Sequence, residues 1–252
     1  ELEVRQSTQF VIKDLKIVSK VGEIDISGIF EEINIFDSIF NPCITGNILI
    51  KDSIGLSHIL SFDGSEALLI DISKDENSDI GKFRKAFRIY KQSNRKENGA
   101  SESYILHFVA DEFMYSDQQR INQAFVGTYS DIVQKILENY LKVTPDNAGG
   151  IYEITSGIRN ITIPNLRPLE AMEWCAKRAV DINQAPNFLF FQNQAGYNFV
   201  TLSNLLLKDV VLDIKFNPKN HSYTSIDSDN QIDWISVSQF VSCFKQPFDS
   251  LA

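Results

Sequence analysis

Short runs of alternating apolar and polar residues dominate the stretch from Phe10 to Asp111, and this period of two constrains the fold more than any other feature. For example, Tyr104, Leu106 and Phe108 fall on one face of a predicted strand. About six or seven such strands fit into this stretch, the spacing expected of an antiparallel barrel or sandwich. The clearest runs are Ile24–Ser27, Ile33–Ile35, Ile44–Ile50, Glu66–Ser73, Phe83–Tyr90 and Tyr104–Phe108.

The middle of the chain has a helical pattern instead. Thr128 and Asp131 have the spacing of a capping box, and apolar residues then recur at helical intervals. Pro168 is typical of the first turn of a second helix, in which Glu170 and Glu173 come early and Lys177 and Arg178 late, so that their charges complement the helix dipole. A four-residue turn ending in Gly196 lies between two short apolar arms, which predicts a β-hairpin. The predicted elements are helices at Ser130–Leu141 and from Pro168 to about Val180, and a hairpin of Phe188–Gln192 and Tyr197–Leu202.

Extended, polar-rich segments return after Leu212. The sequence therefore predicts an α+β fold that is mainly β, an antiparallel β-barrel-like domain with an inserted small α+β domain. The expected return strands are Asp213–Phe216, Ser222–Ile226 and Trp234–Phe244. The predicted domains are residues 1–112 as the first part of the barrel-like domain, 113–210 as the insertion, and 211–252 as its return strands.

Composition excludes several classes of protein. With 43% hydrophobic residues among 252, the chain can bury a sizeable core and is not an acidic disordered tail. No apolar run approaches the ~18 residues of a membrane helix, and we expect no membrane insertion. A net charge of -9 argues against non-specific affinity for nucleic acid. The cysteines are predicted to be reduced and are Cys43, Cys175 and Cys243.

A search for catalytic and metal-binding motifs gives no site. Phosphate-binding loops, zinc-protease motifs and nucleophile elbows are absent from the sequence, so we predict no catalytic residues, cofactor or metal. The acidic pattern Asp227-x-Asp229-x-x-x-Asp233 lacks the glycine and closing glutamate of a calcium loop and is interpreted as a solvated turn. Carboxylates such as Glu31-Glu32 and Asp75-Glu76 leave open a polysaccharide-degrading enzyme. The histidines are interpreted as structural and are His58, His107 and His221.

One window, Lys82–Lys96, holds seven basic residues and no acidic one, which leaves 17 basic against 33 acidic residues, or -16, in the rest of the chain. Period-two counting places Phe83 and Phe87 on one face of the strand and Arg84 and Arg88 on the other. We interpret the window as a basic strand that meets an acidic surface of another subunit, and less favourably as a carbohydrate-binding or nucleic-acid-binding surface. The candidate subunit-interface residues are Lys82, Arg84, Lys85, Arg88 and Lys91.

Three consecutive segments resemble a known family. They contain an amphipathic strand, a Pro42-x-x-x-Gly46 entry to an apolar strand that ends in Asp52, and a Gly64-x-Glu66 step into the next strand. This pattern is similar to the first tube domain of baseplate hub proteins, the tail-tube initiators of contractile-tailed, T-even-like bacteriophages. The order of the downstream helices, hairpin and strands also resembles that family. The matching segments are Ile29–Pro42, Ile44–Asp52 and Phe62–Ile70.

The resemblance implies a structural virion protein without catalytic residues. It implies a homotrimeric ring that continues the tail tube, contacts the tail tube protein and the central spike protein, and surrounds DNA that passes without specific binding. The expected location is the tail baseplate of the virion, after assembly in the host cytoplasm. Because hubs of this family usually carry a second tube-like domain, we expect this chain to be part of a longer polypeptide. The alternatives are the cell-wall polysaccharide-degrading enzyme and the carbohydrate-binding or nucleic-acid-binding β module.

Overall fold

The computed structural model describes residues 11–60, 62–73, 83–99, 101–143 and 150–208 of the 252-residue chain. The chain divides into two units, one of Ile12–Leu207 and the other of Glu1–Val11 with Lys208–Ala252. In the first part of the chain the elements are β1 (Val11–Ser19), β2 (Gly22–Asp25), β3 (Phe30–Phe36), β4 (Thr45–Asp52), α1 (Leu56–Ile59), β5 (Ala67–Ser73), β6 (Phe83–Asn98) and β7 (Ser101–Ala110).

The elements that follow are α2 (Asp111–Asp117), β8 (Ala124–Gly127), α3 (Tyr129–Tyr140), β9 (Arg159–Thr162), α5 (Pro168–Ala176), β10 (Phe188–Asn193), β11 (Gly196–Thr201) and α6 (Leu202–Leu206).

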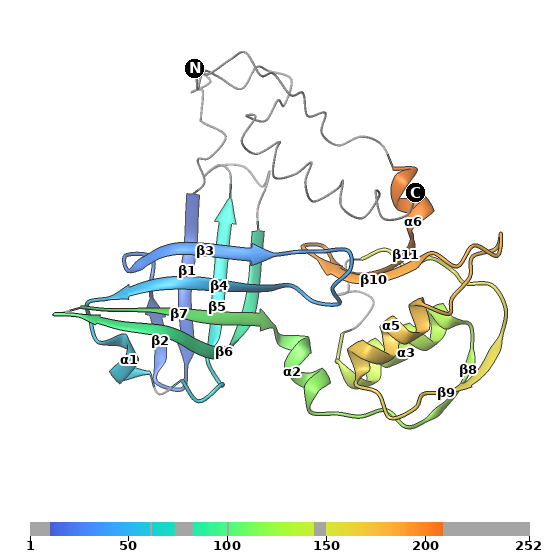
Figure 1. Ribbon diagram of the computed structural model, residues 1–252, viewed down its shortest axis with the longest axis horizontal. Helices are drawn as coiled ribbons and strands as arrows, with labels where there is room; N and C mark the ends of the chain where they lie inside the picture. The colour runs from blue at the N-terminus through green and yellow to red at the C-terminus, as the bar shows by residue number, and fades with distance from the viewer. Residues whose placement is uncertain (1–10, 61, 74–82, 100, 144–149, 209–252) are drawn as a thin grey trace, which may run out of the picture. The chain divides into compact units, whose positions relative to one another are not determined.

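Among the described residues, seven strands form one sheet in the order β2-β1-β5-β6-β7-β4-β3. The pairings of β1 with β2, β3 with β4, β4 with β7, β5 with β6 and β6 with β7 are antiparallel. Figure 1 shows β1 and β5 running crosswise to β3, β4 and β7, so that the sheet curls over its own core. The predicted fold class, α+β and mainly β with a barrel-like antiparallel sheet, is confirmed.

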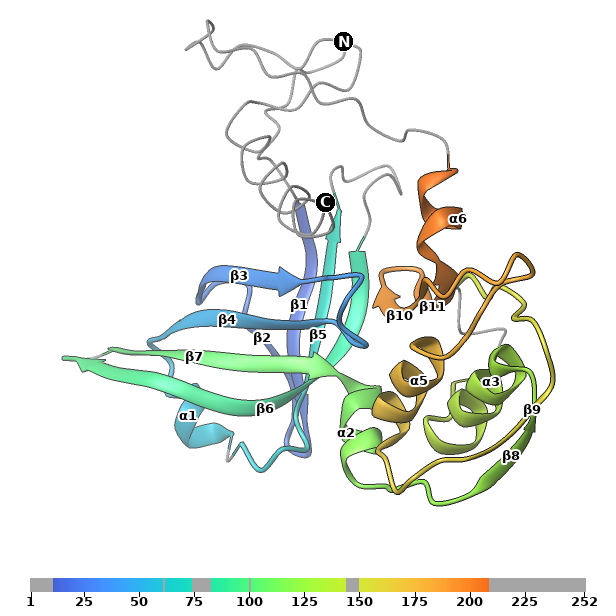
Figure 2. The same cartoon turned by 45° about the vertical axis from the view of Figure 1, so that its right-hand side comes forward.

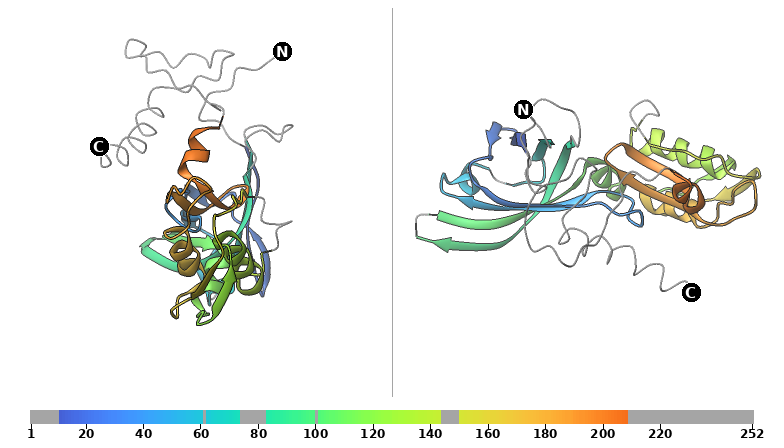
Figure 3. Two further views of the ribbon diagram at one scale, coloured as in Figure 1. Left: turned by 90° about the vertical axis from the view of Figure 1, so that its right-hand side faces the viewer. Right: turned by 90° about the horizontal axis from the view of Figure 1, so that it is seen from above.

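The long strand β6 joins the two halves of the curled sheet. Its first residues pair with β5, and its residues from Phe87 to Asn98 pair with β7. The register shifts between Ile89 and Lys91 and between Ser93 and Lys96, and such bulges bend a strand and increase its twist. The hairpin of β6 and β7 extends past the neighbouring strands (Figure 3). The sequence predicted this strand only as far as Tyr90 and did not predict its extension.

Alternate residues of the strands fill the core of the sheet. Its largest fully buried members include Tyr104, Phe87 and Phe108, and the rings of Phe87 and Phe108 lie with their centroids 4.8 Å apart. Gly46 of β4 leaves the space that the Phe108 ring occupies, because an added Cβ would lie 2.3 Å from Phe108 Cζ. The glycine of the Pro42-x-x-x-Gly46 pattern is therefore required by packing.

The second group of elements surrounds its own apolar core, in which α3 and α5 lie side by side (Figure 2). The predicted capping box is confirmed, since Thr128 Oγ1 accepts from the Asp131 N–H at 3.2 Å and Asp131 accepts from the Thr128 N–H at 3.3 Å. The predicted hairpin is also present as β10 and β11. The second helix ends at Ala176, so its predicted extension to Val180 is wrong.

Polar contacts connect this group to the sheet. The buried amide of Gln192 accepts from the Ile44 N–H at 3.1 Å and donates to Glu112 at 3.4 Å. The Leu169 N–H donates to Ser116 Oγ at 3.1 Å, which links α5 to α2. The helix α2, which the sequence did not predict, therefore stands between the sheet and the rest of the α+β elements.

Two sets of predictions remain untested. The return strands at 213–216, 222–226 and 234–244 lie outside the described residues, so the domain boundaries stay predictions.

None of the described helices combines the length and apolar character needed to span a membrane.

Candidate functional site

Asp52 and Glu66, the carboxylates of the segments that resemble baseplate hub proteins, stabilise turns. Asp52, buried at the end of β4, accepts hydrogen bonds from the N–H groups of Ile54 and Ser57, each at 3.0 Å, and from the Tyr104 hydroxyl at 3.2 Å. Burial opposes the charged form of Asp52, but the backbone hydrogen bonds outweigh it and lower its pKa. Buried Glu66 accepts from the Gly64 N–H at 3.0 Å, where Gly64 adopts a φ of +88°. These carboxylates have structural partners that account for them.

Two arginines of the basic window, Arg84 and Arg88, lie on the outer face of the sheet. Arg84 is exposed and lies 3.6 Å from Asp71, and Arg88 forms a 2.9 Å ion pair with Asp111 of α2. Arg88 also donates to the Ser65 carbonyl oxygen. The predicted separation of these arginines from the apolar side chains of β6 is correct, but both already have partners within the chain.

Lys85 is half buried and lies on the opposite face of β6, the face that it shares with Phe83 and Phe87. Burial lowers the pKa of Lys85, and the nearby carboxylates of Glu112 and Asp37 oppose this shift. Lys85 thus faces acidic groups of its own chain, whereas Lys82 lies outside the described residues. Whether any of these residues contacts another subunit stays a prediction.

Three exposed lysines share the outer face of the sheet, and we call them the lysine face: Lys51, Lys91 and Lys96. Ser103 of β7 pairs with Lys51 on one side and with Lys96 on the other, so the two lysines point the same way. No ion pair involving these lysines is found in the described part of the chain, whereas their neighbour Arg95 is paired with Glu102 at 2.8 Å. The lysine face therefore offers positive charge that nothing described in the chain neutralises.

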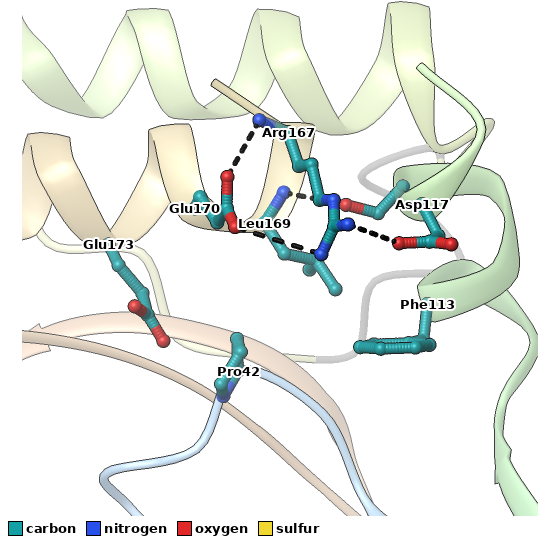
Figure 4. Close-up of a pocket in the computed structure, with 8 residues that line it drawn as sticks. Pro42, Phe113, Asp117, Arg167, Leu169, Glu170 and Glu173 are labelled. Atoms are coloured by element: carbon teal, nitrogen blue, oxygen red, sulfur yellow. Dashed lines mark hydrogen bonds and ion pairs between the residues drawn. The ribbon is translucent and has the colours of Figure 1, made fainter. Parts of the chain in front are cut away.

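A pocket of about 90 Å³ lies where α2 and α5 meet the loop between β3 and β4 (Figure 4). Its apolar walls come from Pro42, Phe113 and Leu169, three segments that are far apart in the sequence. We call it the acidic groove, since its polar lining includes three carboxylates and one arginine: Asp117, Glu170, Glu173 and Arg167, with Ser116 beside them.

The charges of the acidic groove are unequally satisfied. Arg167 lies between two carboxylates, with 3.0 Å to Asp117 and 3.8 Å to Glu170. In Figure 4 the Glu173 carboxylate lies apart from this cluster, on the side of Pro42. The Glu173 carboxylate has no hydrogen bond or ion pair within the described residues. Burial raises its pKa, and the positive charge of Lys177, four residues later in the chain, opposes this shift. Glu173 is therefore a half-buried acid that has a cation nearby but no direct ion pair among the described residues.

No metal or catalytic centre is assembled among the described residues. No group of three His, Cys, Asp or Glu side chains that could hold a metal ion is found there. Ser93 Oγ lies 2.7 Å from His107 Nε2, but the imidazole also packs against the Tyr90 ring, which fits the predicted structural histidine. Cys43 and Cys175 are buried free thiols, and burial raises their pKa values to about 11 and about 12.

Several proposed groups cannot be placed. His221, Cys243 and the acidic pattern Asp227 to Asp233 lie outside the described residues, as do Asp75 and Glu76, and the His58 side chain is not described. Of the other carboxylate pair, Glu31 and Glu32 are both exposed.

Sequence reasoning missed the acidic groove. It treated Glu170 and Glu173 only as charges that complement the dipole of their helix. Glu170 does act in that way, since it accepts from the Arg167 N–H at 3.0 Å. The sequence contained no signal that Pro42 and Phe113 would approach Glu173.

Comparison with known proteins gives one curated relative and several structures. The chain is 22% identical over 206 residues to the probable baseplate hub protein gp334 of Vibrio phage KVP40, a match that covers 79% of this chain. The predicted resemblance to baseplate hub proteins is confirmed. The chain spans about half the length of this relative, 47%. No protein-family model matches the chain.

Two solved tail proteins match the chain in structure. The 43 kDa tail protein of prophage MuSo2 from Shewanella oneidensis matches with a TM-score of 0.50 and 9% identity, over 75% of this chain and 54% of that protein. The tail protein from Neisseria meningitidis MC58 matches with a TM-score of 0.48 and 12% identity, over 82% of this chain and 56% of the other. At this identity the match with the MuSo2 protein supports the fold and nothing beyond it.

Proposed function

We propose that the chain is a structural protein of a phage tail baseplate, and that it forms the tube-like part of a hub subunit. The observation that carries this proposal is the match to a baseplate hub protein over 79% of the chain. In this role the subunit joins the tail tube protein to the central spike protein, in a homotrimeric ring around the passage for DNA. Its location is the virion tail baseplate, assembled in the host cytoplasm.

The curled sheet supports a ring assembly. Its outermost strands in the described residues are β2 and β3, each hydrogen-bonded to one neighbouring strand. Exposed sheet edges are prone to unwanted pairing and are commonly covered by a neighbour, and side-by-side packing in a closed ring covers them. Phe36 and Phe40, at the end of β3 and in the loop that follows, are 53% and 60% exposed, as apolar residues at a subunit contact would be in an isolated chain.

The charge of the chain suits a passage rather than a DNA-binding site. A net charge of -9 repels a polyanion at long range, so DNA is not retained by the subunit as a whole. We further propose the domain arrangement that the sequence predicts, with residues 1–112 and 211–252 in the tube-like domain and 113–210 as the insertion.

The proposed function is non-enzymatic. Asp52 and Glu66, the buried carboxylates of the matching segments, are engaged by backbone N–H groups and hold turns. They are therefore not available as a free acid and base pair. A carboxylate elsewhere in the chain would have to supply hydrolytic activity.

The proposal is tested by the size and binding of the purified chain. We expect a trimer by analytical ultracentrifugation, ring-shaped particles by electron microscopy, and binding to the tail tube and spike proteins of the same phage. A chain that stays monomeric at high concentration and binds neither protein would refute the proposal. Hydrolysis of cell-wall polysaccharide that is lost when one particular carboxylate is replaced would favour an enzyme instead.

A further inference from the structure

The molecule presents two complementary charged surfaces. The acidic groove contains the half-buried Glu173 carboxylate beside the apolar side chains of Pro42 and Phe113. The lysine face contains three exposed ammonium groups without an ion pair in the described residues. A carboxylate that is partly removed from water is stabilised by a cation, and a lysine side chain adds an aliphatic stem that can pack on apolar walls.

The outer end of the lysine face lies far from the groove of the same chain. Ser103, the cross-strand neighbour of Lys96, lies eight residue steps along β7 from Asp111 at the start of α2. At ~3.3 Å per residue this is about 26 Å, which exceeds the reach of a lysine side chain. Lys96 therefore does not reach the groove of its own chain, and it can occupy only the groove of another copy.

We propose that the acidic groove is a docking site for the lysine face of a second copy of this chain, with Lys96 of that copy placed against Glu173. This inference rests on the proposed function, because it assigns the contact that holds the subunits of the ring together. The contact is head to tail, since different surfaces of the two copies meet. Repetition of a head-to-tail contact generates a closed ring when the rotation between subunits closes.

The composition of the groove explains why a lysine end suits it. A volume of about 90 Å³ holds the end of one long side chain but not a folded element. Arg167 already pairs with Asp117 and Glu170, whereas Glu173 has only the more distant charge of Lys177 and no direct ion pair, so a further cation can bind at Glu173. The exposed Phe113 ring, with 38% of its surface accessible, provides an apolar wall for the methylene groups.

The test measures self-association of the full chain by sedimentation, at low salt and at high salt. Glu173→Lys and Lys96→Glu each place like charges at the contact, and we expect each to weaken association at least tenfold. Glu173→Gln removes the charge without reversing it, and we expect a smaller loss. The combined variant Glu173→Lys/Lys96→Glu restores opposite charges, and its association should return to within about threefold of the unchanged chain.

Matched controls keep the outcome specific. Glu138→Lys on α3 and Lys135→Glu on the same helix change the net charge by the same amounts at exposed positions, and we expect association within about twofold of the unchanged chain. An unchanged circular dichroism spectrum verifies that each variant is folded. A ring that persists in both single variants, or a combined variant that is no better than either, overturns the inference while the proposed function stands. A chain that never associates overturns both.

Discussion

Replacing Gly46 by alanine should destabilise the sheet strongly. The added Cβ would lie 2.3 Å from Phe108 Cζ and 2.4 Å from the backbone oxygen of Asn34. Carbon atoms in contact normally lie 3.5–4.0 Å apart, so the ring would have to move by more than 1 Å. The Asn34 oxygen cannot move in the same way, because β3 and β4 are paired in register at this point.

The magnitude follows from two opposing effects. Overpacking of a core costs about 1–3 kcal/mol, and two simultaneous overlaps place Gly46→Ala near 3 kcal/mol. The lower entropy of alanine in the unfolded chain returns about 0.4–1 kcal/mol, which leaves a net loss of about 2 kcal/mol. For a chain of this size that loss corresponds to a fall of about 4–8 °C in Tm.

The assay is thermal unfolding followed by circular dichroism, with Gly28→Ala as the matched control. A Cβ at Gly28 meets no atom within 4 Å, so we expect its Tm to be unchanged or slightly raised. In a Phe108→Leu background the smaller side chain relieves part of the overlap, and Gly46→Ala should then cost less. A Gly46→Ala variant that unfolds within 1 °C of the unchanged chain would refute the packing argument.

Three further predictions concern polar contacts. Asp52→Asn should cost about 1–3 kcal/mol at pH 7, because an amide accepts fewer of the N–H bonds. The folded-state pKa of Asp52 is lowered, so this stabilisation is complete above the unfolded pKa of ~3.9 and is lost as the pH falls through the folded pKa. Denaturant unfolding between pH 3 and 7 should therefore show that the difference in free energy of unfolding between the unchanged chain and Asp52→Asn becomes smaller in acid. Gln192→Leu leaves the buried Ile44 N–H without its acceptor, and its free energy of unfolding should fall by about 1–3 kcal/mol in the same assay. If the stability did not change, this hydrogen bond would not link the sheet to the α+β elements. Thr128→Ala should cost about 1 kcal/mol and Thr128→Ser much less, and equal losses would contradict the capping role.

The regular parts of the fold could be predicted because their local patterns agree with their environment. Alternation identified strands such as β4 and β7, which are buried on one face, and a capping box marked the start of α3. The helix α2 gave no such signal. It has no side-chain cap, and it follows directly on β7 at Ala110, so the strand pattern continues into it. The second helix was overextended because Lys177 and Arg178 suit a helix end without specifying where it falls.

The candidate site was less accessible to sequence reasoning because it depends on contacts between distant segments. Pro42 belongs to the loop before β4, Phe113 to an unpredicted helix, and Glu173 to α5. No spacing in the sequence connects them. The basic window, by contrast, was visible as a run of like charges, but the sequence could not show which of its residues have partners within the chain.

That distinction changes how the basic window can act. Its described arginines Arg84, Arg88 and Arg95 lie within 3.6, 2.9 and 2.8 Å of carboxylates of the same chain. The fork of guanidinium N–H groups suits such fixed pairs, whereas an exposed lysine is a mobile, strongly hydrated point charge. Among the described residues of the window, the charge available to another molecule is therefore that of Lys91 and Lys96 rather than that of all seven basic residues. Salt screens exposed charges that lie farther apart than the Debye length, ~8 Å at physiological ionic strength, and an exposed ion pair contributes little. The strength of the association must therefore come from burial of Glu173 and the apolar walls around it.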